Sequence, residues 1–316
     1  MRFPQVDLNG ITTVSLEKRD SKVAVNLLGR PCSAGDAAGF FEKLPKFLKA
    51  AELNEFIGLV VRARKRDLPF HVMMGAHVIK VGLSPIIIDL IKKRIVTGLS
   101  LNGAGLIHDL ELSFAGKTSE DVLAGLADGS FGMSKKTGQL FAEVTTLADQ
   151  MEIGLGEAAG DFIATAGAPH AGLSLFAAAR KYAVPITVHV GIGTDIVHQM
   201  NTFDPGATAK ASYRDFKILS RLLIEADRGG VVANVGSAVV LPEVFLKALT
   251  VARNLKRRKR NIITADFDMI SHYRPVVNVV KRPTADGGRG FYFTGHHEIM
   301  IPLLAWGLKT YITKIQ

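Results

Sequence analysis

The stretch Ile95–Glu111, IVTGLSLNGAGLIHDLE, has the clearest structural pattern in the chain. An apolar run rich in β-branched residues breaks at Asn102-Gly103-Ala104-Gly105 and resumes as a helix-like segment that carries His108 and Asp109. This order predicts a buried parallel strand, a tight glycine turn and the start of a helix. Such a turn lies at the carboxyl end of a strand, where open α/β sheets bind ligands, and the free N–H groups of a helix start favour an anion. A G-x-G turn alone is weak evidence, because most such turns bind nothing.

The composition is that of an ordinary globular protein, with 47% apolar and 22% charged residues among 316. The single cysteine, Cys32, excludes an internal disulfide and indicates a reducing compartment. The first residues do not resemble a signal peptide, and no apolar run is long enough to span a bilayer. These features predict a cytoplasmic protein without membrane contact.

The net charge of +10 is partly due to the run Lys256-Arg257-Arg258-Lys259-Arg260. The run has two interpretations: a patch for nucleic acid or an acidic partner, or a solvated helix end whose cations complement the helix dipole. It lacks the interleaved aromatic residues of a base-stacking surface, which favours the second interpretation. Nucleic-acid binding is therefore not expected, although a basic surface favours anionic ligands.

Strand and helix patterns alternate from residue 70 to the end, which predicts one doubly wound, mostly parallel, Rossmann-like α/β domain over residues 67–316. Residues 1–66 are expected to form a helical flank. The elements predicted with distinctive boundaries are a strand at Ile11–Leu16, a helix from Ser33 through Phe41, a helix at Pro85–Arg94 capped by Ser84, a capping box at Thr118–Asp121, a helix at Ser212–Asp227 and a strand at Val276–Val280.

Ionisable residues gather where the predicted strands end, and the carboxyl ends of an open α/β sheet converge on one crevice. The candidates are His77, His108, Asp109, Asp195, His198, Asp266, Asp268, His296, His297 and Glu298. Four of them, His108, Asp195, His296 and His297, also suggest a divalent-metal site, although no standard metal-binding motif is present. The sequence contains neither a G-x-S-x-G elbow nor a P-loop.

From about residue 68 to 308 the order of elements resembles deoxyhypusine synthase. The matching segments are Gly75–Gly82, Leu101–Gly105 followed by Ile107–Asp109, Val184–Asp195, Val235–Glu243, Thr264–Phe267 and Tyr292–Leu304. The resemblance implies an NAD-binding homotetramer in which hydride leaves a polyamine and a lysine carries the alkylamine group as an imine. The segment that supplies this lysine is replaced here by Arg282–Phe291, and the acidic pair after the glycine turn is reduced to Asp109.

Three hypotheses follow. The first is a deoxyhypusine synthase-like enzyme that binds NAD and transfers a hydride or an alkylamine group on a different small substrate. The second is a non-catalytic NAD-binding or regulatory protein on the same fold, and the third is a metal-dependent enzyme.

In the first hypothesis two sets of residues build the site. The predicted cofactor-binding residues are Ala76, Asn102, Gly103, Ala104, Gly105, Gly236 and Asp266, with the glycine turn around the pyrophosphate and Asp266 on a ribose hydroxyl. The predicted catalytic residues are His108, Asp109, Asp195, His296 and His297, with a histidine as general base.

Overall fold

The computed structural model describes residues 7–25, 28, 40–41, 44–256 and 261–313. Cys32, the predicted helix from Ser33 apart from Phe40 and Phe41, and most of the basic run after Lys256 lie outside the described residues. Within the described part, no helix is both long and apolar enough to cross a membrane.

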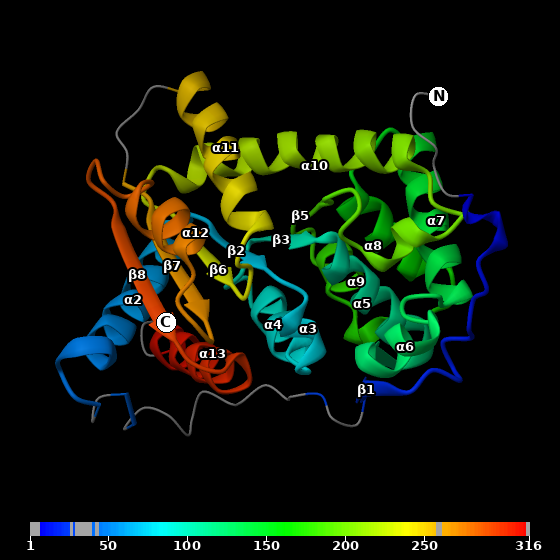
Figure 1. The fold of residues 1–316 in the computed structure, drawn as a ribbon. Coiled ribbons are helices and arrows are strands. Elements are labelled where there is room, and N and C mark those ends of the chain that lie inside the picture. The colour runs from blue at the N-terminus through cyan, green and yellow to red at the C-terminus, as the bar shows by residue number, and fades with distance from the viewer. Residues whose placement is uncertain (1–6, 26–27, 29–39, 42–43, 257–260, 314–316) are drawn as a thin grey trace.

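The centre of the molecule is a six-stranded sheet in which every neighbouring pair is parallel (Figure 1). The strands are β2 (Phe70–Met74), β3 (Gly98–Asn102), β5 (Ile186–His189), β6 (Val231–Val235), β7 (Ile263–Asp268) and β8 (Arg289–Thr294). Their spatial order is β5-β3-β2-β6-β7-β8. The first three strands in the chain therefore extend the sheet in one direction and the last three in the other, which is the doubly wound arrangement that the sequence predicted.

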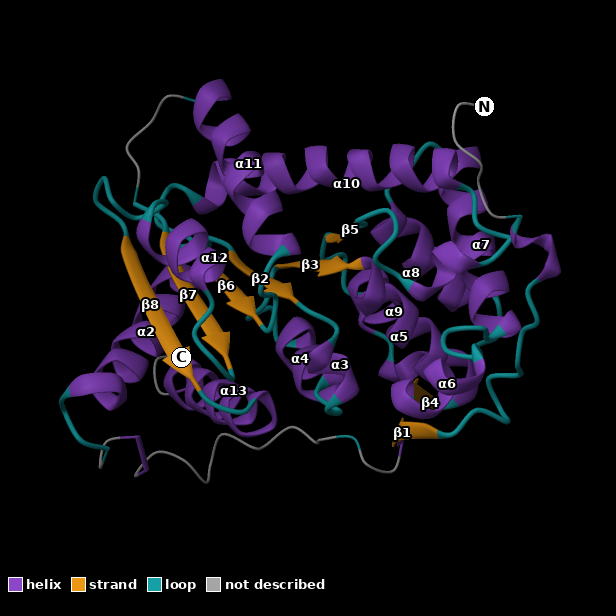
Figure 2. Cartoon of the chain, in the orientation of Figure 1, coloured by secondary structure: helices purple, strands orange, loops and turns teal. Residues whose placement is uncertain are grey.

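Helices cover both faces of the sheet (Figure 2). On the first face α2 (Leu48–Lys65) packs against α13 (His297–Thr313), and α4 (Ser84–Lys92) lies between α13 and α9 (Leu175–Lys181). On the second face α10 (Pro205–Ala226) packs along α11 (Val240–Leu255). Because the strands are buried on both faces, their sequences are nearly continuous apolar runs.

A large insertion separates β3 from β5 and builds the half of the molecule at the right of Figure 1. It contains α5 (Gly103–Ala115), β4 (Lys117–Glu120), α6 (Val122–Asp128), α7 (Lys135–Gln150), α8 (Leu155–Thr165), the short turn η4 (Ala171–Leu173) and α9. The N-terminal strand β1 (Ser21–Ala24), which follows the turn η1 (Leu8–Gly10), pairs antiparallel with β4. Helix α10 crosses between the halves, because it contacts α11 at one end and α7 and α8 at the other.

The second face of the sheet carries a buried polar chain across three strands. His71 Nε2 lies 2.8 Å from Ser100 Oγ, which lies 2.6 Å from Thr187 Oγ1, which lies 3.0 Å from His189 Nε2. Burial lowers the pKa of His71 to about 3 and that of His189 to about 4, so both rings are neutral. Each polar side chain in the chain has a partner, as buried polar groups require.

Five predictions about individual secondary-structure elements are wrong. Val276–Val280 forms a π-helical turn, η6 (Val276–Lys281), after the short helix α12 (Tyr273–Pro275), because Val279 enters the apolar core under α11 while Asn278 bonds Glu243. Ile11–Leu16 contributes only an isolated bridge at Val14.

The other three errors concern helix starts. Thr118 lies in β4, and its hydroxyl makes a hydrogen bond with the side chain of His108 on α5. Asp121, not Thr118, caps α6. Helix α10 begins at Pro205 with Asp204 as its cap, well before Ser212. Ser84 is the first residue of α4 and makes no capping bond.

Asp215 joins α10 to the edge of the sheet. Its Oδ2 accepts the backbone N–H of Gly156 at 3.0 Å and that of Val188 at 2.7 Å, and no part of the side chain is exposed. Burial is the main cause that raises the pKa of this carboxyl to about 8. The carboxyl is therefore largely protonated in the folded protein at neutral pH.

A carboxyl whose folded pKa exceeds its unfolded pKa contributes stability at low pH and loses it as the pH rises through the folded value. Asp215→Asn keeps an acceptor for both N–H groups and removes the titration. As the pH rises from 5 to 8, the free energy of unfolding measured in urea should fall less steeply for Asp215→Asn than for the wild type. The two slopes should differ by up to about 1.4 kcal/mol per pH unit. Asp67→Asn, at a side chain that is 98% exposed, is the control and should follow the wild-type slope. Equal slopes for Asp215→Asn and the wild type would show that Asp215 is ionised in the fold.

Candidate functional site

The site begins where the order of strands reverses, between β2 and β6. The turn after β2 meets the turn after β6: Gly75 N–H donates to Val235 O at 2.9 Å, and a Cβ on Gly75 would lie 2.0 Å from Gly236 O. Gly236 has φ +65°, a conformation that favours glycine, and a Cβ there would lie 2.7 Å from the ring of His297. The two glycines thus let backbone and an imidazole ring converge at the reversal point.

Two histidine rings meet beside these glycines. His77, the first residue of the short helix α3 (His77–Lys80), lies 5.3 Å from His297 between ring centroids. His297 is buried, and its Nε2–H donates to Phe267 O at 3.1 Å. The other ring nitrogen, Nδ1, is buried without a partner. Burial, followed by the neighbouring His297, lowers the pKa of His77.

Buried polar atoms without partners gather on the second face of β6, β7 and β8. Asn234 Nδ2 donates to Asp266 Oδ1 at 2.7 Å, but Asn234 Oδ1 and Asp266 Oδ2 accept nothing. Thr264 Oγ1, two residues earlier on β7, and Tyr292 Oη, in register with Asp266 on β8, are also unpartnered. Burial is the main cause that raises the pKa of Asp266 to about 7. Since buried polar groups are normally paired, such a gathering indicates bound water or ligand.

The predicted glycine turn after β3 is occupied by a side chain of the protein. Asn102 caps α5 by accepting Gly105 N–H at 3.0 Å. The Asp195 carboxylate lies against Gly103, where a Cβ would be 2.0 Å from its Oδ2, and accepts the backbone N–H of Ala104. Burial raises the pKa of Asp195 to about 6. The helix start therefore does attract an anion, and that anion is Asp195.

His108 belongs to a separate buried cluster on the far side of α5. Its Nδ1 lies 2.6 Å from Thr118 Oγ1, and that hydroxyl bonds Glu111. Glu111 also pairs with Arg19 at 2.8 Å and accepts from Thr137 at 2.8 Å. Burial opposes ionisation of Glu111, but its interactions with His108 and Arg19 outweigh burial and lower its pKa to about 2. The cluster ties the N-terminal segment to α5.

The remaining two predicted catalytic residues lie apart from this arrangement. Asp109 is fully buried in α5 and holds the start of α9, since its two oxygens accept Ser174 Oγ at 2.7 Å and Leu175 N–H at 2.9 Å. The His296 side chain is 67% exposed and lies 3.7 Å from Glu298. The structure thus brings Gly236 and His297 together, with Ala76 beside Gly75, and gathers Asn102, Gly103, Ala104, Gly105 and Asp195 in a second group one strand away.

The four residues considered for a metal do not share a site. In the described part of the chain, no group of three or more His, Cys, Asp or Glu side chains is placed to hold a metal ion. His297 faces Gly236 and His77, whereas Asp195 faces Gly103 and His108 faces Thr118.

Some residues of the site were not among the predicted site residues. Gly75, Asn234 and Tyr292 were not chosen, although Gly75 directly follows the first strand and Asn234 lies inside the apolar run of β6. A polar residue within an apolar strand could have indicated a site residue, because its side chain must find a buried partner.

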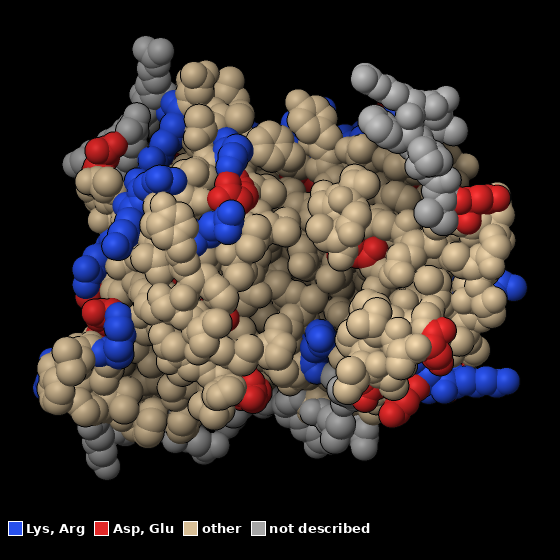
Figure 3. All heavy atoms as spheres, in the orientation of Figure 1, with Lys and Arg blue, Asp and Glu red and all other residues tan. Residues whose placement is uncertain are grey.

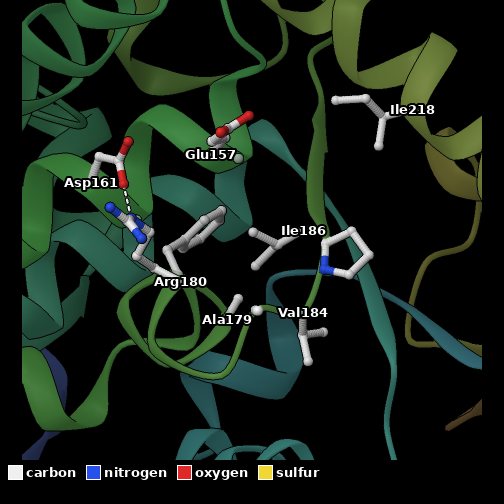
Figure 4. Close-up of a pocket in the computed structure, with 12 residues that line it drawn as sticks. Glu157, Asp161, Ala179, Arg180, Val184, Ile186 and Ile218 are labelled. Carbon is white, nitrogen blue, oxygen red and sulfur yellow. Dashed lines mark hydrogen bonds and ion pairs between the residues drawn. The ribbon is translucent and has the colours of Figure 1, made fainter.

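The surface is hollowed near the middle of the face shown in Figure 3, at the carboxyl ends of β2 and β3 in the same orientation, and most charged side chains lie around the rim. A larger cavity of 510 Å³ lies at the amino end of β5 (Figure 4). Its lining includes Pro185, Ile186, Phe176 and the Asp161–Arg180 ion pair, which already neutralises its two charges. It lacks the converging unpartnered groups found at the opposite end of the strands.

The fold and the position of the site define a Rossmann-like, doubly wound α/β protein. No protein-family model matches the sequence, and no curated protein sequence matches it. A protein assigned to the LOR/SDH group from Methanococcus maripaludis S2 has a similar structure, with 10% identity over 90% of this chain and 76% of that chain and a TM-score of 0.53.

AgrE, solved as a ternary complex with ornithine and NAD⁺, is similar at 11% identity over 84% of this chain, with a TM-score of 0.50. This chain spans only 33% of the length of AgrE. A protein assigned as a deoxyhypusine synthase from Entamoeba histolytica has 9% identity over 82% of this chain and 87% of that chain, with a TM-score of 0.47. At these sequence identities the similarities concern the fold alone.

The contact between the two glycine turns leads to a stability prediction. Gly75→Ala places a methyl group against the backbone of Gly236, which cannot move aside as a side chain could, and should lower the free energy of unfolding by about 1–3 kcal/mol. Gly172→Ala is the control, because a Cβ there meets nothing within 4 Å, and it should change stability by less than about 0.5 kcal/mol. Urea unfolding of both variants measures this difference. Equal stabilities would mean that the turns after β2 and β6 are not in close contact.

Proposed function

We propose that this protein is an NAD-binding enzyme that transfers a hydride, or a group with the help of a hydride step, on a small substrate. The observation that carries the proposal is the set of unpartnered buried polar atoms beside two glycine turns at the reversal of strand order, where open α/β sheets bind dinucleotides. The NAD⁺ complex of AgrE, on a similar fold, supports the choice of cofactor.

The residues at the reversal point fit a dinucleotide. Gly75 and Gly236 let the turns after β2 and β6 meet at the reversal point, beside the start of α3. Asp266 Oδ2 and Asn234 Oδ1 are free to accept hydrogen bonds from ribose hydroxyls. When bound, the dinucleotide supplies the hydride acceptor or donor.

His297 is the best-placed general base. Its Nε2–H donates to Phe267 O, so Nδ1 is the ring nitrogen that can accept a proton when the ring is neutral. The nitrogen is buried and has no partner in the protein, so a proton that it accepts from a bound substrate displaces no native bond. Burial and the neighbouring His297 lower the pKa of His77, which favours the neutral form of that ring.

The narrower possibilities inferred from the deoxyhypusine synthase resemblance remain proposals. These are alkylamine transfer, a polyamine as donor and a homotetrameric assembly. The lysine expected to carry the alkylamine has no counterpart in the segment Arg282–Phe291, so we favour hydride transfer.

Calorimetric titration with NAD⁺ tests the cofactor. The wild type should bind NAD⁺. Asp266→Asn should bind it about tenfold or more weakly, because a hydrogen bond to a charged acceptor is replaced by one to a neutral acceptor. Since the pKa of Asp266 is about 7 and ribose hydroxyls favour its ionised form, the wild-type affinity should rise from pH 6 to pH 8. The variant should show a smaller rise.

Asp128→Asn, at an exposed residue of α6, is the matched control and should bind NAD⁺ as the wild type does. A wild-type protein that gives no heat with NAD⁺ or NADH, and no change in melting temperature with either, would refute the proposal. Tight binding with no hydride exchange on any amine, alcohol or carbonyl compound would instead favour the regulatory interpretation.

A further inference from the structure

A second, smaller cavity lies one strand away from the reversal point, above the carboxyl end of β3. Its volume is 140 Å³, or about five water molecules at about 30 Å³ each, which is far too small for a dinucleotide. It is enclosed by α3, the first two turns of α5, β4, α6 and the loop before η5 (Ile196–Gln199). Its lining includes Lys80, His108, Thr194 and Asp195.

Lys80 is the unpaired cation of this cavity. It is the last residue of α3 and is half-buried, and its backbone N–H donates to Ala76 O, yet its ammonium makes no ion pair or hydrogen bond with the described residues. Its charge contributes to lowering the pKa of His77 three residues earlier. A half-buried ammonium without an acceptor loses part of its hydration without compensation, so an anion that enters the cavity is favoured.

Asp195 is the unpaired anion. Asp195 is only 8% exposed, and its side chain accepts hydrogen bonds from the backbone N–H groups of Ala104 and His198 but pairs with no cation. One of its oxygens, Oδ2, has no partner. The carboxylate therefore has remaining capacity to accept hydrogen bonds from a donor, and a cationic donor is the strongest choice.

The other acidic and basic side chains at the cavity are paired with each other, with one cation between two anions. Arg19 pairs with Glu111 at 2.8 Å and with Glu120 at 3.3 Å, and Glu120 also accepts Gly132 N–H at 3.1 Å. The remaining lining is largely apolar and is contributed by Ala104, Ile107, Val122, Phe131 and Ile196. One free cation, one free anion and an apolar wall therefore face the same small space.

We propose that this cavity binds a small α-amino acid as its zwitterion, with the carboxylate at Lys80, the ammonium at Asp195 and the side chain against Ile107 and Ile196. A simple amine would leave Lys80 unpaired, and a simple carboxylate would leave Asp195 unpaired. An α-amino acid carries an ammonium group and a carboxylate on the same carbon atom, so one molecule can pair with both Lys80 and Asp195. The inference concerns binding alone and holds whether or not NAD is the cofactor of the neighbouring site.

The test uses the full chain without cofactor and three matched probes: L-norvaline, pentanoate, which lacks the ammonium, and butylamine, which lacks the carboxylate. L-Alanine, L-glutamate and L-ornithine extend the panel to other side chains. In calorimetric titrations at least one amino acid should bind, and each half-molecule should bind at least tenfold more weakly than L-norvaline. No binding of any amino acid, or equal binding of pentanoate and L-norvaline, would overturn the proposal.

Two variants localise the ligand. Lys80→Met should weaken amino-acid binding at least tenfold, whereas Lys92→Met, at an exposed lysine of the neighbouring helix α4, should not change it. Asp195→Asn keeps an acceptor for Ala104 N–H and should reduce the preference for L-norvaline over pentanoate. If Lys80→Met weakens NAD⁺ binding and leaves amino-acid binding unchanged, Lys80 serves the dinucleotide and the proposal is wrong. Because these titrations need no cofactor, a failure of NAD⁺ to bind leaves their result intact.

Discussion

The contact between the turns that follow β2 and β6 determines the rest of the site. Gly75 and Gly236 are close enough that a single Cβ would collide with backbone, and this closeness lets His297 and His77 approach from two different helices. The contact occurs where the chain has extended the sheet in one direction and turns to build the other half. Open α/β sheets with this strand order bind ligands at the reversal point, so strand order favours a ligand at that place.

The polar residues at the reversal point and those at the start of α5 differ in the kind of group that has no partner. At the reversal point the unpartnered atoms are mainly neutral acceptors and hydroxyls, which suits the hydroxyl-rich ribose of a nucleotide. At the α5 start the unpaired groups are one ammonium and one carboxylate. Asp195 also occupies the helix terminus that an external phosphate would otherwise use, so the turn after β3 does not offer its N–H groups to a pyrophosphate.

The alternation of apolar strands and helices could be read from the sequence, because a strand buried on both faces needs a continuous apolar run whatever its neighbours are. The site could be read only in part. The sequence predicts Gly236, Asp266 and His297 as site residues because they lie at or after the ends of predicted strands. The structure places all three near the reversal point. Asp109 also follows a strand, but its position on the inner side of α5 directs it to α9, and only tertiary packing decides which side of a helix faces the crevice. The spatial order of the strands is likewise absent from local sequence, so the choice between the turns after β2 and β3 could not be made from it.

Four buried aspartates share a raised pKa, yet they do not share a role, and their bonds tell them apart. Asp109 has both oxygens bonded to the start of α9, and Asp215 holds two N–H groups with one oxygen while the other faces the backbone at Gly154. These two residues are enclosed and structural. Asp195 and Asp266 each keep an unbonded oxygen beside other unpartnered polar groups or a cavity. A raised pKa reports burial in all four cases, and it is the unused bonding capacity next to accessible space that separates a binding group from a structural one.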